Sequence, residues 1–413
     1  MSNLGEEIGV LLADGPNLDA FSRLRVSQNN ILYTGTFDYD KRPELWAEKV
    51  EGSASPAVYD ANSRSIALTL GTASGQKVTR QTIEYFRYAT GNSMLIFNTF
   101  HLGPRKANVR KRVGYFDAED GLFLEQTGTE LALVVRSFTS GAAVDTRILQ
   151  ADWNQDTLDG SGDENNPSGA TLDENSTQIL AIDFQWLGVG RIRFYVDIDG
   201  QLVPIHSIGN ANAGQTIPYM RTPNLPCRYE IENTGVAASG TTFRQICTSV
   251  LREGGEQILS EERSVDMGLT TFTAVNAYTT LIGIRTKATH LRAAVRFLEA
   301  TVLNLDANDA IIFSVFRKPT VSTAGAVWVD GGGAVEYSLS NIDISAGPGT
   351  KIVTEIVSAV DKGKGATNQT RSRGTRLGAD IDGVREEVWL AVRCAVTGES
   401  ADCKGALTYE ELR

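Results

Sequence analysis

The stretch QILAIDFQW-LGVG-RIRFYVDID-GQLVPIH, residues 178–206, decides the fold class of this chain. Apolar and polar residues alternate through both long segments, and a period of two is typical of half-buried β-strands. Reversals at 188–190 and at Asp199-Gly200 predict a three-stranded meander, because Asp-Gly favours a tight hairpin turn. The expected cross-strand pairs are Trp186 with Ile192, Phe184 with Phe194, Ile182 with Val196, Val196 with Val203, and Phe194 with Ile205. One face of the meander is therefore a core face.

The opposite face of the meander is polar. It carries Asp183, Gln185, Arg191, Arg193 and His206. Such a face could be a functional site, but a solvated or subunit-facing sheet is the favoured interpretation. These patterns indicate a large β-rich scaffold and name no chemistry.

Length and charge bound the possibilities. A chain of 413 residues is too long for one ordinary core, so two or three domains are expected. The net charge of −11 argues against general binding to nucleic acid or anionic membranes. No apolar run reaches the length of a membrane span, and the N-terminus lacks a basic signal-peptide start. We expect the protein to fold in a cytoplasm.

Short apolar runs separated by Gly-, Asn-, Asp- and Ser-rich turns predict an all-β chain with two antiparallel β-sandwich or jelly-roll-like domains. The predicted parts are an N-terminal arm over 1–30, a first sandwich over 31–250, a linker over 251–267, and a second sandwich over 268–413. The arm includes Phe21, Arg23 and Arg25, and we expect it to dock on a neighbouring subunit.

The four cysteines fall at matched positions of two expected hairpins. A turn centred on Ala237 places Cys227 opposite Cys247, and a turn at Gly398-Glu399 places Cys394 opposite Cys403. Each pair is either a disulfide of a particle that leaves the cell or two small apolar residues packed side by side.

Enzymatic signals are sparse. The three histidines show no metal-binding spacing, and no nucleophile elbow or phosphate-binding loop is present. A glycosidase pair of carboxylates is compatible with the spacing, but the sequence singles out no such pair. We expect no enzyme activity and no cofactor, and we assign no catalytic residue.

The acidic segment DWNQDTLDGSGDE raises a calcium site as a weaker hypothesis. Asp152, Asn154, Asp156 and Asp163 occupy positions 1, 3, 5 and 12 of an EF-hand-like loop. Position 6 is Thr157, where the turn requires glycine, so a solvated loop is favoured.

The run PRKANVRKR is the densest positive cluster of this acidic chain. Its charged members are Arg105, Lys106, Arg110, Lys111 and Arg112. It lacks the interleaved aromatic residues of a nucleic-acid site, so packing against an acidic patch of a neighbouring subunit is favoured.

Several stretches together resemble a family of structural proteins from tailed bacteriophage particles that carry an N-terminal DAFGRLRVS motif. Here the motif is DAFSRLRVS, with Ser22 in place of glycine. The other matching stretches are NVRKRVGYFD (108–117), VVRSFTSG (134–141), DWNQDTLDG (152–160), IDFQWLGVGRIRF (182–194) and YMRTPNLPCRYEIENTG (219–235).

The resemblance implies a virion protein that is assembled in the host cytoplasm. We expect a non-enzymatic structural component of the tail, baseplate or fibre that forms a homo-oligomer, with a trimer favoured. Its expected partners are other virion proteins and a host-surface glycan or protein. The alternatives are a head decoration protein or capsid fibre and, from a different class, a glycan-cleaving tail enzyme.

Overall fold

The computed structural model describes residues 18, 19, 24, 29–254, 260–306, 308–319, 325–344, 349–359, 366–371 and 375–412. These residues form β-strands and two short 3₁₀ helices, η1 (Gln150–Asp152) and η2 (Ala288–His290), so the predicted all-β class is confirmed. The chain divides into two compact units. Unit 1 comprises 1–81 and 86–256, and unit 2 comprises 82–85 and 257–413.

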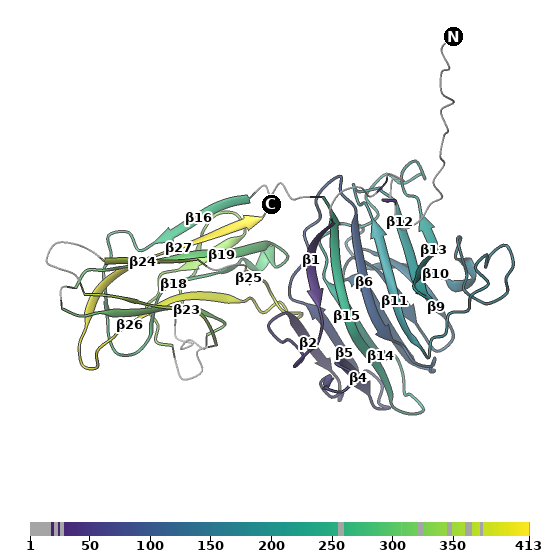
Figure 1. Cartoon of the computed structure of the whole chain (residues 1–413), viewed down its shortest axis with the longest axis horizontal. Coiled ribbons are helices and arrows are strands. Elements are labelled where there is room, and N and C mark those ends of the chain that lie inside the picture. The colour runs from purple at the N-terminus through teal and green to yellow at the C-terminus, as the bar shows by residue number, and fades with distance from the viewer. Residues whose placement is uncertain are drawn as a thin grey trace, which may run out of the picture. The chain divides into compact units, whose positions relative to one another are not determined.

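Unit 1 contains an eight-stranded antiparallel sheet (Figure 1). Its strand order is β13 (Gln201–Ile208), β12 (Ile192–Ile198), β11 (Thr177–Phe184), β6 (Met94–His101), β15 (Thr241–Glu253), β4 (Ser65–Leu70) and β3 (Val58–Asp60), and β1 (Asn29–Gly35) also pairs with β15.

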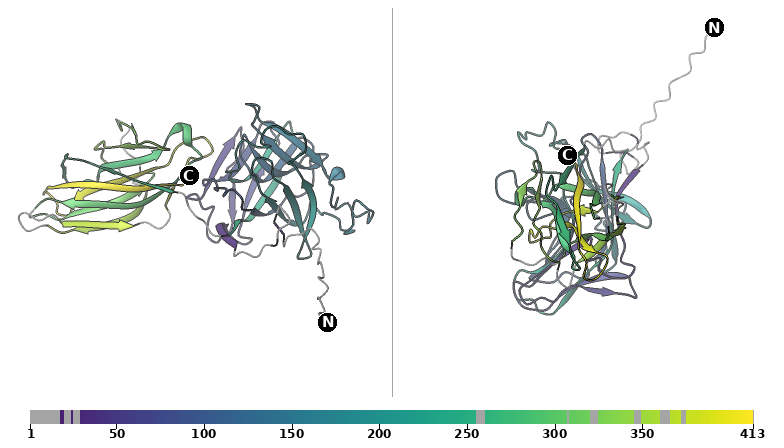
Figure 2. Two further views of the ribbon diagram at one scale, coloured as in Figure 1. Left: turned by 90° about the horizontal axis from the view of Figure 1, so that it is seen from above. Right: turned by 90° about the vertical axis from the view of Figure 1, so that its left-hand side faces the viewer.

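A seven-stranded antiparallel sheet completes unit 1. Its strand order is β10 (Val144–Leu149), β9 (Leu131–Ser137), β8 (Gly121–Gln126), β7 (Val109–Phe116), β14 (Cys227–Asn233), β5 (Lys77–Thr82) and β2 (Trp46–Glu51). Ile182 and Phe194 of the first sheet share one hydrophobic core with Val113 and Tyr229 of the second. The two sheets therefore enclose the core between them, and strands build both units (Figure 2).

The predicted meander exists as β11, β12 and β13, but its first register was wrong by two residues. Phe184 lies opposite Ile192 rather than Phe194, because the connection spans residues 185–191 and closes with a hydrogen bond from the Gln185 amide to the Arg191 carbonyl. A shift of two leaves every side chain on its predicted face. At the second turn the predicted pair of Val196 with Val203 is confirmed. Beyond it, a bulge pairs Phe194 with His206 instead of Ile205.

Unit 2 contains two six-stranded antiparallel sheets. In the first, β16 (Ser260–Asp266), β27 (Ala401–Leu412), β19 (Ala294–Asn304) and β24 (Ala366–Arg371) are neighbours, with β17 (Phe272–Ala274) on β27 and β25 (Arg376–Leu377) on β19. The second has the order β21 (Val329–Asp330), β22 (Val335–Ser338), β18 (Thr279–Thr286), β26 (Glu387–Cys394), β20 (Ile311–Arg317) and β23 (Thr350–Val357). Side chains of both sheets, among them Phe297, Leu390 and Leu407, share a separate core.

The division between the units falls at 256/257, inside the segment expected to be a linker. Much of that segment is strand, because β15 runs to Glu253 and β16 begins at Ser260. Among the described residues there is no helix with the length and apolar character needed to cross a bilayer.

Both predicted cysteine hairpins were wrong. Cys227 lies in β14 of the seven-stranded sheet, whereas Cys247 lies in β15 of the eight-stranded sheet. Cys394 and Cys403 are likewise divided between the two sheets of unit 2. All four are free thiols. In each case the chain passes from one layer of the sandwich to the other between the two cysteines, where a tight hairpin was expected.

Candidate functional site

The outer face of the seven-stranded sheet carries a network of charged side chains, several of which are buried. In β14, Tyr229 points into the core, so the alternate residues Glu230 and Glu232 lie on the outer face. In β7, Arg112 lies directly opposite Glu230, and Arg110 lies opposite Glu232. Period-two alternation on neighbouring strands thus places opposite charges side by side.

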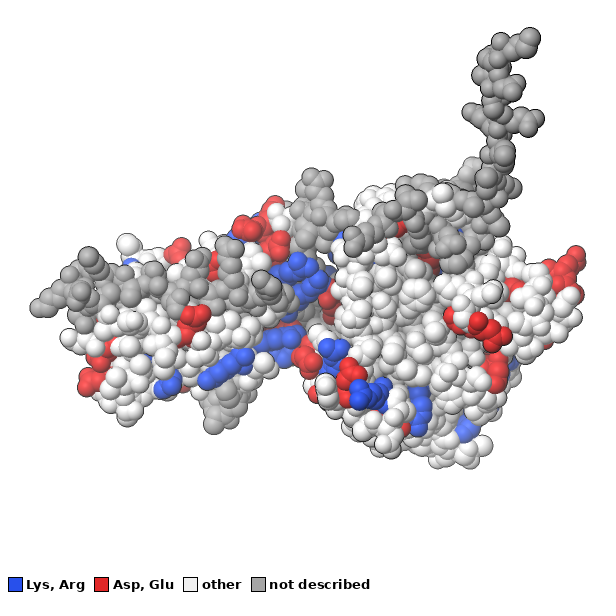
Figure 3. All heavy atoms as spheres, in the orientation of Figure 1, with Lys and Arg blue, Asp and Glu red and all other residues white. Residues whose placement is uncertain are grey.

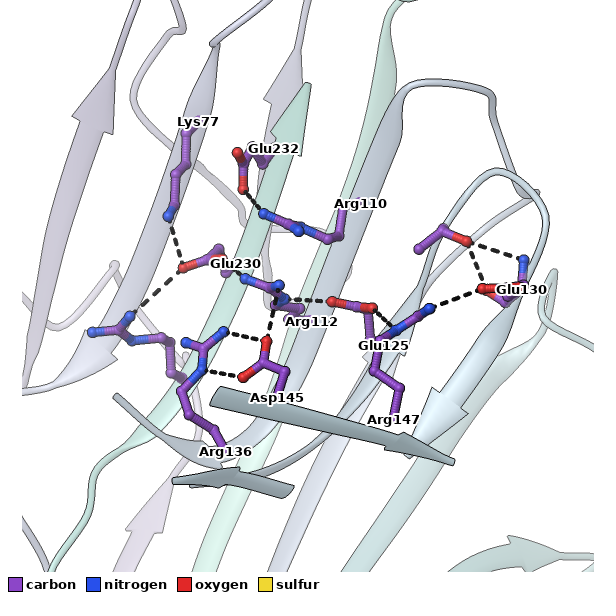
Figure 4. Close-up of polar contacts among 12 residues, drawn as sticks. Lys77, Arg110, Arg112, Glu125, Glu130, Arg136, Asp145, Arg147, Glu230 and Glu232 are labelled. Carbon is purple, nitrogen blue, oxygen red and sulfur yellow. Dashed lines mark hydrogen bonds and ion pairs between the residues drawn. The ribbon is translucent and has the colours of Figure 1, made fainter. Parts of the chain in front are cut away.

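Arg112 is the centre of this network (Figure 4). Its Nε donates to Glu125 Oε2 over 2.7 Å and its Nη1 donates to Glu230 Oε1 over 3.1 Å, while Nη2 lies 3.7 Å from Asp145 Oδ2. Burial alone would lower the pKa of Arg112, but these three carboxylates outweigh it and raise the pKa. A single buried guanidinium therefore holds three carboxylates from three strands.

Glu230 is held in its ionised form. Burial would raise its pKa, but Lys77, Arg112 and Arg228 together lower the pKa to about 2. Lys77 Nζ lies 3.2 Å from Glu230 Oε2, and the Glu230 side chain is only 2% exposed. The carboxylate is therefore a fixed negative charge at ordinary pH.

The edge strand β10 supplies the other side of the network. Asp145 accepts two hydrogen bonds from Arg136, at 2.7 and 2.8 Å. Burial would raise the pKa of Asp145, but Arg136 and Arg112 lower it overall. Arg147 donates to Glu125 Oε1 over 2.8 Å and to Glu130 Oε2 over 2.9 Å. Glu125 thus lies between two arginines.

An aromatic ring forms the floor beneath two of these arginines. The guanidinium carbons of Arg112 and Arg136 lie 5.5 and 5.1 Å from the centre of the Phe123 ring. Phe116 and Val134 pack with Phe123 in a small apolar cluster separate from the main core. These contacts fix the guanidinium groups from below as the carboxylates fix them from the sides.

A groove of about 450 Å³ opens over this network, within the range of about 300–1,000 Å³ that is common for small-molecule sites. Its charged lining residues are Arg110, Arg112, Glu125, Asp145 and Arg147. Arg110, Asp145 and Arg147 keep 30%, 25% and 34% of their side chains exposed, so a ligand can reach them. The groove offers both donors and acceptors to a polar ligand.

Every charged member of the run 105–112 has a partner in its own chain. The contacts are those of Arg105 with Glu174, Lys106 with Ser239, Arg110 with Glu232, Lys111 with the carbonyl of Leu102, and Arg112 with Glu125 and Glu230. Lys111 is buried, which lowers its pKa to about 8. Two members of the run, Arg110 and Arg112, line the groove. Subunit contact by this run stays a prediction.

The proposed calcium ligands do not converge. Asp156 is buried and accepts hydrogen bonds from Asn166 Nδ2 and from the backbone amides of Leu158 and Ser168. Asp163 caps a separate turn and Asp152 lies in η1, while Asn154 bonds to Ser207. Within the described ranges, no group of three His, Cys, Asp or Glu side chains could hold a metal ion. Asp156 instead organises the loop between β10 and β11.

The polar face of the meander is buried, contrary to its expected exposure. Asp183 pairs with Arg193, and Arg193 also donates to the carbonyl of Leu18. Gln185 donates to Asp19 over 3.2 Å. Residues 18 and 19 of the arm therefore cover their own chain, whereas Phe21, Arg23 and Arg25 lie outside the described residues.

His206, another residue of the polar face, is also buried. It is 7% exposed, and its Nδ1 accepts the backbone amide of Asn154 over 3.1 Å. Burial lowers the pKa of His206. Its neutral form and its bond to the backbone indicate a structural role.

Glu125, Asp145 and Arg147 did not stand out in the sequence. The alternation of charge in β7 and β14 was visible, but which strands are neighbours was not, since β14 follows β7 by more than a hundred residues. Arg110 and Arg112 were noticeable in the sequence only because they belong to the densest run of positive charge.

A scan against protein-family models finds no match, and neither does a search of the curated proteins. Solved structures match over about half of the chain. A β-1,3-glucanase from Mycobacterium marinum is 11% identical, with a TM-score of 0.35, over 54% of this chain and 98% of its own. The β-glucanase of Bacillus licheniformis is 12% identical, with a TM-score of 0.30, over 54% and 98%. An endo-β-1,4-glucuronan lyase from Trichoderma reesei is 12% identical, with a TM-score of 0.29, over 55% and 96%.

These structures correct one expectation from the sequence. The chain was expected to be a non-enzymatic structural component, but the three matched proteins named above are glycan-cleaving enzymes, which agrees better with the glycan-cleaving alternative. At these TM-scores the likeness is a loose one between β-rich folds, and no residue correspondence follows from it.

Proposed function

We propose that the chain is a glycan-cleaving protein whose site is the groove over the seven-stranded sheet. One observation carries the proposal: two carboxylates that line this groove, Glu125 and Asp145, are held by the same guanidinium of Arg112. Cleavage of a glycosidic bond by hydrolysis uses two carboxyl groups on either side of that bond.

The charges suggest a division of roles. Asp145 has a lowered pKa and is partly exposed, which suits the carboxylate that stays ionised and acts as nucleophile or base. Glu125 is the second carboxyl of the groove. It lies between Arg112 and Arg147, and in this division it is the group that protonates the leaving oxygen.

The partly exposed arginines of the groove suit an acidic glycan. Arg110 and Arg147 keep about a third of their side chains exposed, so their remaining donors can form charge-assisted hydrogen bonds with a carboxylate or sulfate group. Elimination from a uronic acid chain uses the same groups: Asp145 removes the proton on the carbon next to the sugar carboxylate, the neighbouring C–O bond breaks, and Glu125 protonates the leaving oxygen, while the arginines neutralise the sugar carboxylate.

The test is release of new chain ends from a panel of neutral and acidic polysaccharides. Reducing ends without ultraviolet absorbance indicate hydrolysis, and reducing ends with the absorbance of an unsaturated uronic acid indicate elimination. Glu125→Gln and Asp145→Asn are each expected to lower the rate by about 100-fold or more, as loss of an acid–base group does. Glu119→Gln, which removes a surface partner of Arg221 outside the groove, is the control.

Cleavage of no polysaccharide in the panel would refute the proposal. Equal rates for the wild type and both groove variants would also refute it, because the activity would then come from elsewhere.

We further propose that the protein acts as part of a tailed bacteriophage particle. The support is the linear series of stretches similar to phage structural proteins, beginning with DAFSRLRVS at 19–27. Mass spectrometry of purified particles, with antibody labelling of the intact particle, tests the location. Absence of the chain from the particles would refute this part alone.

A further inference from the structure

Unit 2 carries a group of aromatic and basic side chains on the outer face of its second sheet. This group, the tyrosine cluster, consists of Tyr278, Ser314, Phe316, Lys351 and Arg393. Tyr278 precedes β18, and the others lie on β20, β23 and β26, which neighbour one another in the order β18-β26-β20-β23. The cluster is therefore assembled from four adjacent segments of one sheet.

The ring of Tyr278 lies at the centre of the tyrosine cluster. Its hydroxyl oxygen accepts a hydrogen bond from Ser314 Oγ over 3.0 Å, and Ser314 is itself fully buried. The Tyr278 and Phe316 rings meet edge to face, with centres 5.1 Å apart. The ring is thus fixed from below, while the Tyr278 side chain remains partly exposed.

Two cations lie close to this ring. Lys351 Nζ is 4.7 Å from the ring centre, and the guanidinium carbon of Arg393 is 5.3 Å from it. Burial would raise the pKa of Tyr278, but Ser314, Arg393 and Lys351 lower it overall. The electric field at the cluster therefore favours negative charge.

These two cations differ from other basic residues of unit 2. Arg285 pairs with Glu336 and Glu387, and Arg317 pairs with Glu386. Among the residues that the structure describes, neither Lys351 nor Arg393 forms an ion pair with a carboxylate. The Nε of Arg393 is buried and makes no hydrogen bond within that same set. In a chain of net charge −11, two cations without a carboxylate partner among the described residues thus lie against one tyrosine ring, and Figure 3 shows further basic side chains on one face of unit 2.

We propose that the tyrosine cluster binds a negatively charged sugar residue, through a uronate carboxylate or a sulfate ester. Lys351 and Arg393 bind the anionic group, and the exposed part of the Tyr278 ring packs against the apolar face of the sugar. This inference rests on the proposed glycan-cleaving function for the class of ligand, and it deepens that function. It makes unit 2 a binding module for an acidic glycan that unit 1 cleaves.

The physical reason is the cost of leaving these charges unpaired. A buried guanidinium N–H without a partner loses its hydration and gains nothing in return. The Lys351 ammonium and the remaining donors of the Arg393 guanidinium can form charge-assisted hydrogen bonds with an anionic group. A neutral sugar could pack on the Tyr278 ring but would form no ion pair with Lys351 or Arg393, so a negatively charged sugar should bind more tightly.

Binding to the full chain is measured by titration calorimetry. The probes are a galacturonate oligosaccharide, a sulfated dextran oligosaccharide, a neutral dextran oligosaccharide and inorganic sulfate. The variants are Lys351→Gln and Arg393→Gln, with Lys287→Gln as the matched control because Lys287 pairs with Asp330 elsewhere in unit 2. Thermal unfolding of each variant verifies that unit 2 remains folded. All titrations are made in the Asp145→Asn background, in which slow cleavage leaves the oligosaccharides intact while they bind.

The expected result is that at least one acidic oligosaccharide binds and that each cluster variant weakens its binding by about 10- to 100-fold, the usual effect of losing a charge-assisted hydrogen bond. Lys287→Gln should bind like the parent chain. Unchanged binding by the cluster variants, or equal binding of the neutral oligosaccharide, would overturn the inference. Inorganic sulfate that binds as tightly as the sulfated oligosaccharide would overturn the assignment to a sugar.

The two proposals fail in different ways. Acidic oligosaccharide binding that depends on Lys351 and Arg393, without cleavage of any glycan, would refute the function of unit 1 and leave the site in unit 2. Cleavage that depends on Asp145, with binding indifferent to both cluster variants, would refute only the site in unit 2.

Discussion

Replacing Glu230 by glutamine tests the charge network beneath the groove. Glutamine has nearly the shape of a protonated glutamate, so the variant isolates the negative charge. The pKa of Glu230 is about 2 in the folded chain against an ordinary value of 4.5. Each unit of pKa difference corresponds to about 1.36 kcal/mol, so ionised Glu230 stabilises unit 1 by about 3 kcal/mol at pH 7.

The stabilisation by Glu230 depends on pH. A lowered pKa means that the stabilisation is fully present above pH 4.5 and disappears as the pH falls through about 2. The difference in free energy of unfolding between wild type and Glu230→Gln should therefore be about 3 kcal/mol at pH 7 and about 1 kcal/mol at pH 3.

Hydrogen exchange of peptides from β7 and β14, measured against urea concentration, reports the stability of unit 1 separately from unit 2. Glu119→Gln is the control, because its ion pair with Arg221 is partly exposed and should contribute about 1 kcal/mol or less. A Glu230→Gln difference that stays constant between pH 7 and pH 3 would refute the account of the network.

Three further results are expected. The wild-type free energy of unfolding should rise between about pH 8 and pH 10.5, because the buried Lys111 loses its proton at a lower pH in the folded chain than in the unfolded one. Lys111→Met should abolish this rise, and urea unfolding across this pH range measures it. Gly200→Ala should lower the free energy of unfolding by about 1–2 kcal/mol, because Gly200 has a φ of +82°, which alanine disfavours, although no neighbouring atom would clash with the added methyl group. Faster hydrogen exchange in β12 and β13 would show this loss, and unchanged exchange would contradict it. Non-reducing mass spectrometry should find four free thiols, and alkylation should reach Cys227 only after unfolding, because burial raises the pKa of its thiol.

Local patterns predicted the strands well. The alternation around Phe184 and Phe194 placed both side chains in the core, and the Asp199-Gly200 turn has positive φ at both residues, as its sequence indicates. The first register was wrong because the turn at 185–191 is longer than its glycines suggested. A register error of two residues leaves each side chain on its predicted face of the sheet but changes its partner on the neighbouring strand.

Longer-range relations could not be predicted in the same way. The cysteine spacing fitted a hairpin, yet the same spacing allows the chain to cross from one sheet to the other. The groove depends on the neighbours of Arg112, which come from β8, β10 and β14. Their adjacency is a property of sheet order, and no local pattern encodes it.

The strand β15 has a mechanical consequence. It is the longest strand of unit 1, pairs with β1, β4 and β6, and ends at Glu253, from which the chain continues into unit 2. A force applied at Glu253 along the axis of β15 loads the hydrogen bonds to its neighbours in shear, so they share it. They would have to break together, whereas a strand peeled from its end loses them one at a time. Tension along this strand is thus resisted by the centre of a sheet.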